Sequence, residues 1–209
     1  QRPFKESLVN SGPGQMSYEL LDREVTKQTL IELDAIADAR GKGDTAPFAL
    51  SVGYMLPHQP YVADPDIYAY YDGKVGPPTL ARPKEGENTY LAWWRQQTGL
   101  NQITQEDEIR ARTAYYALVE TIDIEIGKVL TKLDELGLSE NTLIVYTSDH
   151  GDQLGQRGLW WKQTFYDESA KVPLIMKWAG QIPVNETRSE IVNLVDLSAA
   201  IVEAGGGPE

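Results

Sequence analysis

Short apolar segments alternate with long helical patterns along this chain of 209 residues. The strand candidates are segments 47–55, 142–147 and 172–178, and the helix candidates are segments 17–39, 105–136 and 188–204. Short apolar runs bounded by Pro, Gly or polar residues favour buried strands. Because long helices separate the strands, the sequence predicts an α/β fold with a largely parallel sheet flanked by helices.

The ends of the two longest helices carry recognisable signals. Ser17 is a plausible N-cap for the first helix, and Gly41 is placed to end it. Thr104 and Asp107 form a capping-box pattern, and Gly137 is a natural stop for the second helix. The apolar positions that recur at helical spacing are Leu21, Val25, Leu30, Leu33 and Ile36 in the first helix and Ile109, Tyr116, Val119, Ile126, Val129, Leu133 and Leu136 in the second.

Two connecting segments are distinctive. Segment 56–61 must be a loop, because prolines lie on both sides of His58. Segment 72–101 is rich in Gly, Pro and polar residues and contains Trp93 and Trp94. We expect it to be an irregular, lid-like excursion over the surface.

Composition excludes several classes of protein. The net charge of −12 argues against a nucleic-acid partner, which usually meets a basic face. The absence of cysteine excludes disulfides, thiolate metal sites and a cysteine nucleophile within these residues. No apolar run reaches membrane-spanning length. The length suits one domain with a substantial core, and nothing in the sequence indicates a compartment or an oligomeric state.

Segment 148–152, Ser-Asp-His-Gly-Asp, directly follows a predicted strand. Ligands of α/β sheets bind beyond the carboxyl ends of strands, so Asp149 and His150 are candidate metal ligands. Gly151 would let the backbone turn sharply there. The alternative is that Asp149 caps the next turn and His150 packs against the protein.

Lys162 and His58 are candidate anion ligands. Aromatic neighbours should desolvate Lys162 and strengthen its binding of an anion, although it could equally be an ordinary surface lysine. His58 could equally be a loop histidine bonded to the backbone. The chain has only two histidines, His58 and His150, and both fall at predicted strand ends.

Segment 143–162, LIVYTSDHGDQLGQRGLWWK, and segment 170–175 resemble the sulfatase family, within the alkaline phosphatase-like superfamily. Segment 57–61 resembles that family's histidine loop. Segment 115–137 resembles the helix before the metal strand, and segment 193–204 the helix after it. Residues 1–209 therefore resemble the middle-to-late part of a single sulfatase catalytic domain.

The resemblance implies roles for the candidate residues. Asp149 and His150 match metal ligands, with calcium as the first expectation and manganese or magnesium as alternatives. Many members have Asn at the position of His150, and a histidine there resembles the choline-sulfatase and phosphonate-hydrolase branches. Lys162 and His58 match the residues that hold sulfate oxygens, and one of them should protonate the leaving alcohol.

The family's opening section, with an acidic pair of metal ligands and a Cys or Ser matured to formylglycine, has no match here. The resemblance implies metal-dependent hydrolysis of a small sulfated organic substrate. The alternatives are a phosphonate or phosphate ester hydrolase and a non-catalytic anion-binding remnant. We expect the strand at 142–147 to lack one neighbour. We also expect Asp149, His150, His58 and Lys162 to converge within about 10 Å.

Overall fold

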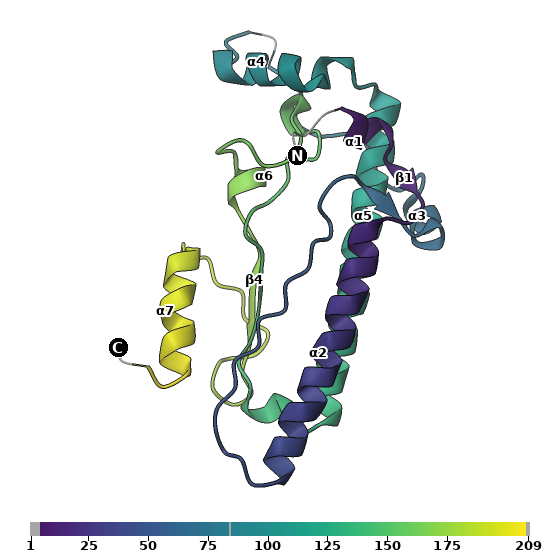
Figure 1. The fold of residues 1–209 in the computed structure, drawn as a ribbon. Coiled ribbons are helices and arrows are strands. Elements are labelled where there is room, and N and C mark those ends of the chain that lie inside the picture. The colour runs from purple at the N-terminus through teal and green to yellow at the C-terminus, as the bar shows by residue number, and fades with distance from the viewer. Residues whose placement is uncertain (1–4, 84, 208–209) are drawn as a thin grey trace.

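A computed structural model describes residues 5–83 and 85–207 (Figure 1). The helices are α1 (Glu6–Val9), α2 (Ser17–Gly41), α3 (Pro65–Tyr71), α4 (Thr89–Thr98), α5 (Gln105–Glu135), α6 (Asp167–Ala170) and α7 (Leu194–Ala204). The 3₁₀ turns are η1 (Leu100–Gln102), η2 (Ser139–Asn141) and η3 (Gln156–Gly158), and the strands are β1 (Gly12–Pro13), β2 (Val62–Ala63), β3 (Ile144–Thr147) and β4 (Leu174–Lys177).

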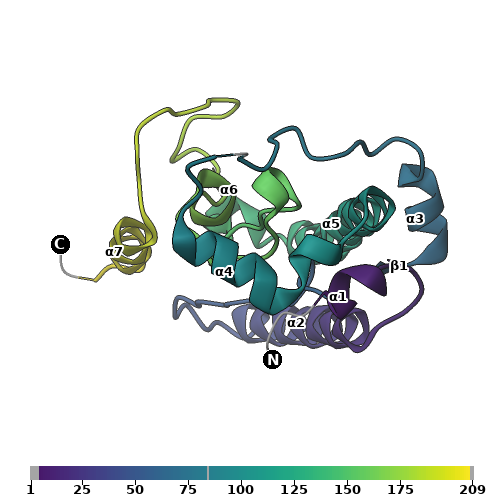
Figure 2. The same ribbon diagram turned by 90° about the horizontal axis from the view of Figure 1, so that it is seen from above.

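The two long helices α2 and α5 lie side by side and run in the same direction (Figures 1 and 2). An ion pair of 2.6 Å between Lys132 Nζ and Asp34 Oδ1 joins their C-terminal halves. The remaining elements lie around the N-terminal half of α5, except for η2, β3, β4 and α7 (Figure 1). The α2–α5 pair is therefore the scaffold against which most of the other segments pack.

The predicted signals at the helix ends are mostly confirmed. Thr104 and Asp107 form the capping box of α5. Gly137 takes a left-handed φ of 67°, and its N–H donates to the Asp134 carbonyl, which closes the helix. The assignment of Ser17 as an N-cap was wrong, because the cap position is Met16 and no side chain accepts a hydrogen bond there.

The buried faces of α2 and α5 differ from the apolar positions of the sequence pattern. Leu21 of α2 is 50% exposed, whereas Asp22 is buried. The reason is that the buried face of α2 meets a loop backbone, and the Asp22 carboxylate accepts hydrogen bonds from the N–H groups of Met55 and Leu56. On α5, Val119 is 45% exposed. The fully buried residues of α5 are mostly small: Ala111, Thr113, Ala114 and Ala117, together with Leu118.

Sheet pairing is limited to two short pairs. β1 and β2 pair in parallel, with Gly12 opposite Val62, whereas β3 and β4 pair antiparallel, with Ile144 opposite Lys177. The parallel character expected for the sheet is thus seen only in the shorter pair. Within the described residues β3 has β4 as its only neighbour, which confirms the expected open side.

The predicted strand at 47–55 is wrong, since this segment has no strand neighbour in the described structure. It runs as an unpaired stretch between the helices and the β3–β4 pair (Figure 1). Its apolar composition favoured a buried strand, but a strand needs a partner for its backbone groups. The predicted burial of β3 was also wrong, because β3 is only partly buried. The strand predicted at 172–178 is confirmed as β4, which is exposed along its length.

The main hydrophobic cluster lies around the N-terminal half of α5. Its buried members are Leu8, Leu56, Tyr61, Ala63, Leu100, Ala111, Ala114, Ala117, Leu118, Ile122, Trp160 and Trp161. The small side chains on α5 leave room for the large aromatic ones of this cluster. The 56–61 loop and the segment after β3 therefore both contribute to this cluster.

Segment 72–101 is more regular than expected. It contains α4, whose first turn is capped by the Asn88 side chain and whose end is fixed by Gly99 at a φ of 76°. Lys84, within this segment, lies outside the described residues. The expectation of an irregular excursion was therefore wrong for residues 89–98, and these capping signals could have identified the helix.

The C-terminal helix begins later than predicted. α7 starts at Leu194 because the Asn193 side chain caps it in a capping box with Asp196. It stands apart from the α2–α5 pair in both views (Figures 1 and 2). None of the helices that the structure describes has the length and apolar character needed to cross a membrane.

Candidate functional site

The segment after β3 brings three of the predicted residues into contact. The Lys162 ammonium lies 2.6 Å from His150 Nε2, and Asp149 Oδ2 lies 3.4 Å from the same nitrogen. His150 Nδ1 lies 2.9 Å from the Gly151 carbonyl oxygen, which can only accept a hydrogen bond. The proton of the neutral ring is therefore on Nδ1, and the Nε2 lone pair points toward Lys162. This orientation is also the one that a metal-binding histidine needs.

Gly151 is required for a reason other than the predicted sharp turn. An added Cβ would lie 2.1 Å from the Glu168 carbonyl oxygen, closer than any real contact. The Gly151 N–H also donates to the Ser169 carbonyl at 2.8 Å. Glycine therefore allows the His150 backbone to pass directly against α6.

The environment of Lys162 differs from the prediction. Trp160 and Trp161 are buried to within 1% and 2% exposure, but Lys162 itself is exposed. Its main chain is fixed, since the Lys162 carbonyl accepts a hydrogen bond of 2.7 Å from the Ser169 hydroxyl. The expected desolvation of its ammonium is therefore wrong, and Lys162 is a solvent-facing cation on a well-anchored backbone.

His58 lies in the 56–61 loop, as predicted. Its Nδ1 donates to the Gln59 carbonyl at 2.7 Å, and its ring stands edge-on to Tyr18 with centroids 5.7 Å apart. Among the described residues, His58 makes no hydrogen bond or ion pair with Asp149, His150 or Lys162. Asp149, His150 and Lys162 are therefore brought together by direct contacts, whereas the expected position of His58 within about 10 Å of them stays a prediction.

A carboxylate that the sequence analysis did not single out connects these parts. Asp152 Oδ2 accepts a hydrogen bond of 2.6 Å from the hydroxyl of Tyr61, which is fully buried. Asp152 Oδ1 accepts hydrogen bonds from the N–H groups of Leu154 at 2.9 Å and Trp161 at 3.1 Å. Burial raises the pKa of Asp152, although these hydrogen bonds oppose the shift. Burial also raises the pKa of Tyr61 far above its ordinary value, so its hydroxyl stays a donor.

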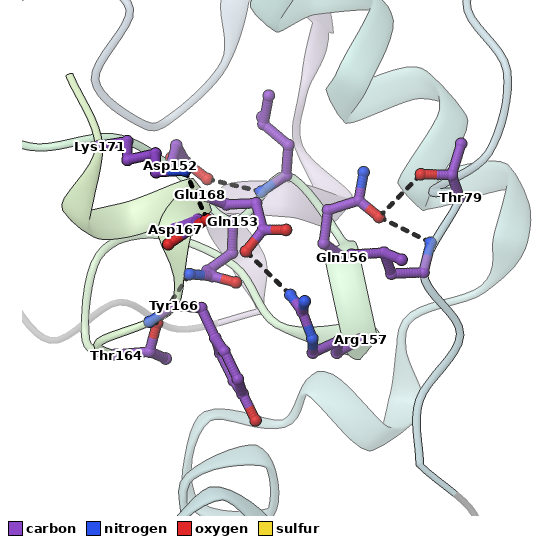
Figure 3. Close-up of polar contacts among 12 residues, drawn as sticks. Thr79, Asp152, Gln153, Gln156, Arg157, Thr164, Tyr166, Asp167, Glu168 and Lys171 are labelled. Atoms are coloured by element: carbon purple, nitrogen blue, oxygen red, sulfur yellow. Dashed lines mark hydrogen bonds and ion pairs between the residues drawn. The ribbon is translucent and has the colours of Figure 1, made fainter. Parts of the chain in front are cut away.

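The turn at 153–158 holds segment 72–101 against the site (Figure 3). The Gln156 side-chain oxygen accepts a hydrogen bond from the Leu80 N–H at 2.8 Å, and the Arg157 N–H donates to the Leu80 carbonyl at 2.7 Å. The Arg157 guanidinium pairs with Glu168 at 2.8 Å and lies over the Tyr166 ring. The turn is thus hydrogen-bonded to segment 72–101 on one side and ion-paired with α6 on the other.

Two further arginines also connect segment 72–101 to the turn at 153–158. Arg95 of α4 is almost completely buried, pairs with Glu87 and donates to the Gly158 carbonyl. Burial lowers the pKa of Arg95 to about 10. Arg112 of α5 donates to the carbonyls of Gly76 at 2.9 Å and Leu154 at 2.6 Å. A mobile lid role for segment 72–101 stays a prediction, and these contacts show that both of its ends are fastened.

The backbone of this turn is strained. Leu154, Arg157 and Trp161 have left-handed φ values of 45°, 56° and 66°. Non-glycine residues in this region cost about 1–3 kcal/mol each and tend to cluster at functional sites. The strained backbone of residues 154–161 therefore agrees with a functional role for this segment, which lies between the candidate residues His150 and Lys162.

The donors at the site suit a divalent metal only in part. Asp149 offers a carboxylate oxygen, which calcium, magnesium and manganese all accept, and His150 offers an imidazole nitrogen, which suits manganese better than calcium or magnesium. Within residues 5–83 and 85–207, no three His, Asp or Glu side chains gather as a metal site would require.

Comparison with known proteins identifies the family. The Sulfatase family model matches residues 5–207, nearly the whole chain. The chain belongs to the sulfatase family. It has the α/β fold of the alkaline phosphatase-like hydrolases, and as a sulfatase-family chain it resembles enzymes that hydrolyse esters.

Individual relatives agree with this assignment. The choline-sulfatase of Rhizobium meliloti is 31% identical over 81% of this chain, and the multifunctional alkaline phosphatase superfamily protein PehA of Trinickia caryophylli is 32% identical over 90%. The phosphonate monoester hydrolase of Silicibacter pomeroyi superposes with a TM-score of 0.71 and 27% identity, covering 86% of this chain and 38% of that one. This sulfatase-family chain spans 33% and 39% of the lengths of the first two proteins.

Proposed function

We propose that this chain provides the anion-binding side of a site that hydrolyses sulfate esters of small organic molecules. The observation that supports it best is the contact of Lys162 with His150, which itself lies 3.4 Å from Asp149, because it places an exposed cation beside a pair of candidate metal ligands. A sulfate ester needs cationic donors for its oxygens and a proton for its leaving alcohol. The segment after β3 and the 56–61 loop offer both.

Lys162 and His58 have separate tasks in this proposal. Lys162 is exposed and holds three donors, so it binds sulfate oxygens most strongly as negative charge develops on them. His58 already uses Nδ1–H for the Gln59 carbonyl, so it can donate from Nε2 only as the imidazolium. That second proton is the one that His58 can pass to the leaving alcohol.

Asp149 and His150 would hold a divalent ion. From the family resemblance we propose calcium, with magnesium or manganese as alternatives, of which manganese accepts an imidazole ligand most readily. Such an ion lowers the pKa of a bound hydroxyl nucleophile and neutralises charge on the sulfate. Release of Lys162 from His150 Nε2 would free that nitrogen for the ion and the ammonium for the substrate. We further propose that the nucleophile is a formylglycine that these 209 residues do not include.

A phosphonate or phosphate ester is the second candidate substrate. It is favoured by the likeness to the phosphonate monoester hydrolase of Silicibacter pomeroyi, at 27% identity. Sulfate and phosphate are both tetrahedral and differ mainly in charge, so the same donors could hold either. A side-by-side titration with the two anions separates the candidates.

The two histidines make the test direct. In a chain labelled with ¹⁵N-histidine, sulfate should shift the ring resonances of both His58 and His150 in a saturable manner. Lys162→Gln should weaken sulfate binding by roughly tenfold, since it removes a charged donor. Lys171→Gln is the matched control, because Lys171 is also exposed and pairs only with Asp167, at 2.8 Å.

Two results would contradict the proposal. One is a sulfate titration that moves neither histidine, or that is affected equally by both lysine changes. The other concerns turnover: with a chromogenic aryl sulfate and added calcium or manganese, we expect no hydrolysis by this chain alone. It offers two metal ligands where about six are needed. Hydrolysis above background would show that the chain holds a nucleophile of its own.

A further inference from the structure

We infer that Asp152 is a positioning residue that sets the spacing between the His58 loop and the His150–Lys162 pair. The inference rests on the proposed roles of those three residues. It assigns Asp152 no contact with substrate or metal. Its role is to hold, through hydrogen bonds, two segments that are distant in sequence.

Each oxygen of the Asp152 carboxylate serves a different segment. Oδ2 accepts from the Tyr61 hydroxyl at 2.6 Å, whereas Oδ1 accepts from the backbone N–H groups of Leu154 and Trp161. Tyr61 belongs to the His58 loop, and Trp161 directly precedes Lys162. One carboxylate therefore ties together the loop that carries one anion ligand and the backbone that carries the other.

The chain positions limit how far apart the candidate residues can lie. His58 is three residues before Tyr61, His150 is two residues before Asp152, and Lys162 is next to Trp161. Three residues of chain reach at most roughly 10 Å. The backbone of each candidate thus lies within that distance of the backbone of Asp152 itself or of a residue hydrogen-bonded to it. His58 nevertheless makes no direct contact with the other two.

The Tyr61–Asp152 bond is the only hydrogen bond in the described structure between residues 56–61 and residues 148–171. The two segments are otherwise linked by apolar packing, which includes the Tyr61 and Trp160 rings with centroids 6.0 Å apart. Packing tolerates small sliding, whereas a short bond from a buried hydroxyl to a carboxylate fixes both distance and direction. The bond therefore determines where the loop sits relative to the segment after β3.

The fastening on the far side of the loop is independent of Asp152. Asp22 of α2 accepts from the N–H groups of Met55 and Leu56, so the start of the loop is held to α2. The end of the loop is held by Tyr61, whose carbonyl accepts from the Gly12 N–H of β1. Loss of the Tyr61 hydroxyl should therefore shift the His58 loop without unfolding it.

The test measures the position of His58 directly. Because the chain has no cysteine, a nitroxide label can be placed at one site with the Phe165→Cys substitution, at a fully exposed residue. Broadening of the two ¹⁵N-histidine ring signals then reports how near each ring lies to residue 165. Tyr61→Phe should change the broadening of His58 and leave that of His150 unaltered.

Two further variants separate positioning from general stability. Asp152→Asn should retain the parental broadening of both histidine signals. Its amide oxygen can still accept from both backbone N–H groups, and its NH₂ can donate to the Tyr61 oxygen. Asp152→Ala should alter the signals of both histidines. Tyr115→Phe is the matched control: Tyr115 packs edge-on to Tyr61, with centroids 5.7 Å apart, and has no hydrogen bond to Asp152.

Sulfate affinity gives the second readout. Tyr61→Phe should weaken sulfate binding by roughly fivefold to tenfold, the factor expected for one charge-assisted hydrogen bond. Tyr115→Phe should leave it unchanged. If the parental chain binds no sulfate, the proposed function fails while the label measurement still decides the role of Asp152. Unaltered His58 broadening in folded Tyr61→Phe would overturn the inference, even if sulfate binds normally.

Discussion

The Gly151→Ala substitution tests the close approach on which the site depends. The new methyl group would lie 2.1 Å from the Glu168 carbonyl oxygen and 3.1 Å from the Lys171 carbonyl oxygen. Both are backbone atoms, so no side-chain rotation can relieve the overlap. The segment must move away from α6 by about 1 Å to reach an ordinary carbon–oxygen contact of roughly 3.3 Å.

The cost follows from two contributions. Forcing an extra carbon into a packed position costs about 1–3 kcal/mol, and the hydrogen bond of 2.8 Å from the Gly151 N–H to Ser169 contributes about 1 kcal/mol. Replacing glycine also removes about 0.4–1 kcal/mol of unfolded-state entropy, which offsets part of the loss. We expect the free energy of unfolding to fall by about 2–3 kcal/mol.

Thermal unfolding followed by circular dichroism measures this effect. At about 2–4 °C per kcal/mol for a chain of this size, the midpoint should fall by about 4–12 °C. Gly127→Ala is the matched control, because Gly127 lies within α5 and nothing lies within 4 Å of its added Cβ. That variant should be more stable than the parent by about 0.5–1 kcal/mol. Equal stability of the two variants would refute the close-approach argument.

Three further changes have defined outcomes. At Asp107, hydrogen bonds from Thr104 and Arg110 outweigh burial and lower the pKa, so its contribution to stability is present above the unfolded value and disappears as pH falls through the folded one. Asp107→Ala should therefore cost about 1 kcal/mol in urea unfolding at pH 7 and much less near pH 2. Arg95→Met removes the buried one of the two arginines that pair with Glu87, together with the bond to the Gly158 carbonyl, so limited proteolysis should cut segment 72–101 faster while α5 stays intact. Ile175→Glu, at a residue of β4 that is 62% exposed, should change stability by less than about 0.5 kcal/mol and reduce self-association measured by light scattering.

Local signals in the sequence were enough to place the long helices. The Thr104–Asp107 capping box and Gly137 fixed both ends of α5, because such signals act over three or four residues. The buried face was harder to predict. The pattern favoured large apolar residues such as Val119, but the face that is buried carries Ala114 and Ala117, whose size matters only because bulky aromatics pack in the same cluster.

The candidate site shows the same division between local and distant information. Asp149, His150 and Lys162 lie close in sequence, and the resemblance at 143–162 was specific enough to name them. Tyr61 gave no such signal, because its partner Asp152 lies 91 positions away. The strand expected at 47–55 failed for a related reason: an apolar run shows that a segment can be buried but not whether a neighbouring strand is available.

The left-handed turn at 154–161 also limits how this sequence can drift over evolution. Leu154, Arg157 and Trp161 have left-handed backbone conformations, which glycine adopts with less strain. Any advantage of these residues over glycine must therefore come from their side chains, such as the guanidinium of Arg157 bound to Glu168. A lineage that no longer needed segment 72–101 fastened to this turn would be expected to accept glycine at position 157 first. Glycine at position 157 of a relative would thus indicate that segment 72–101 is no longer fastened to this turn.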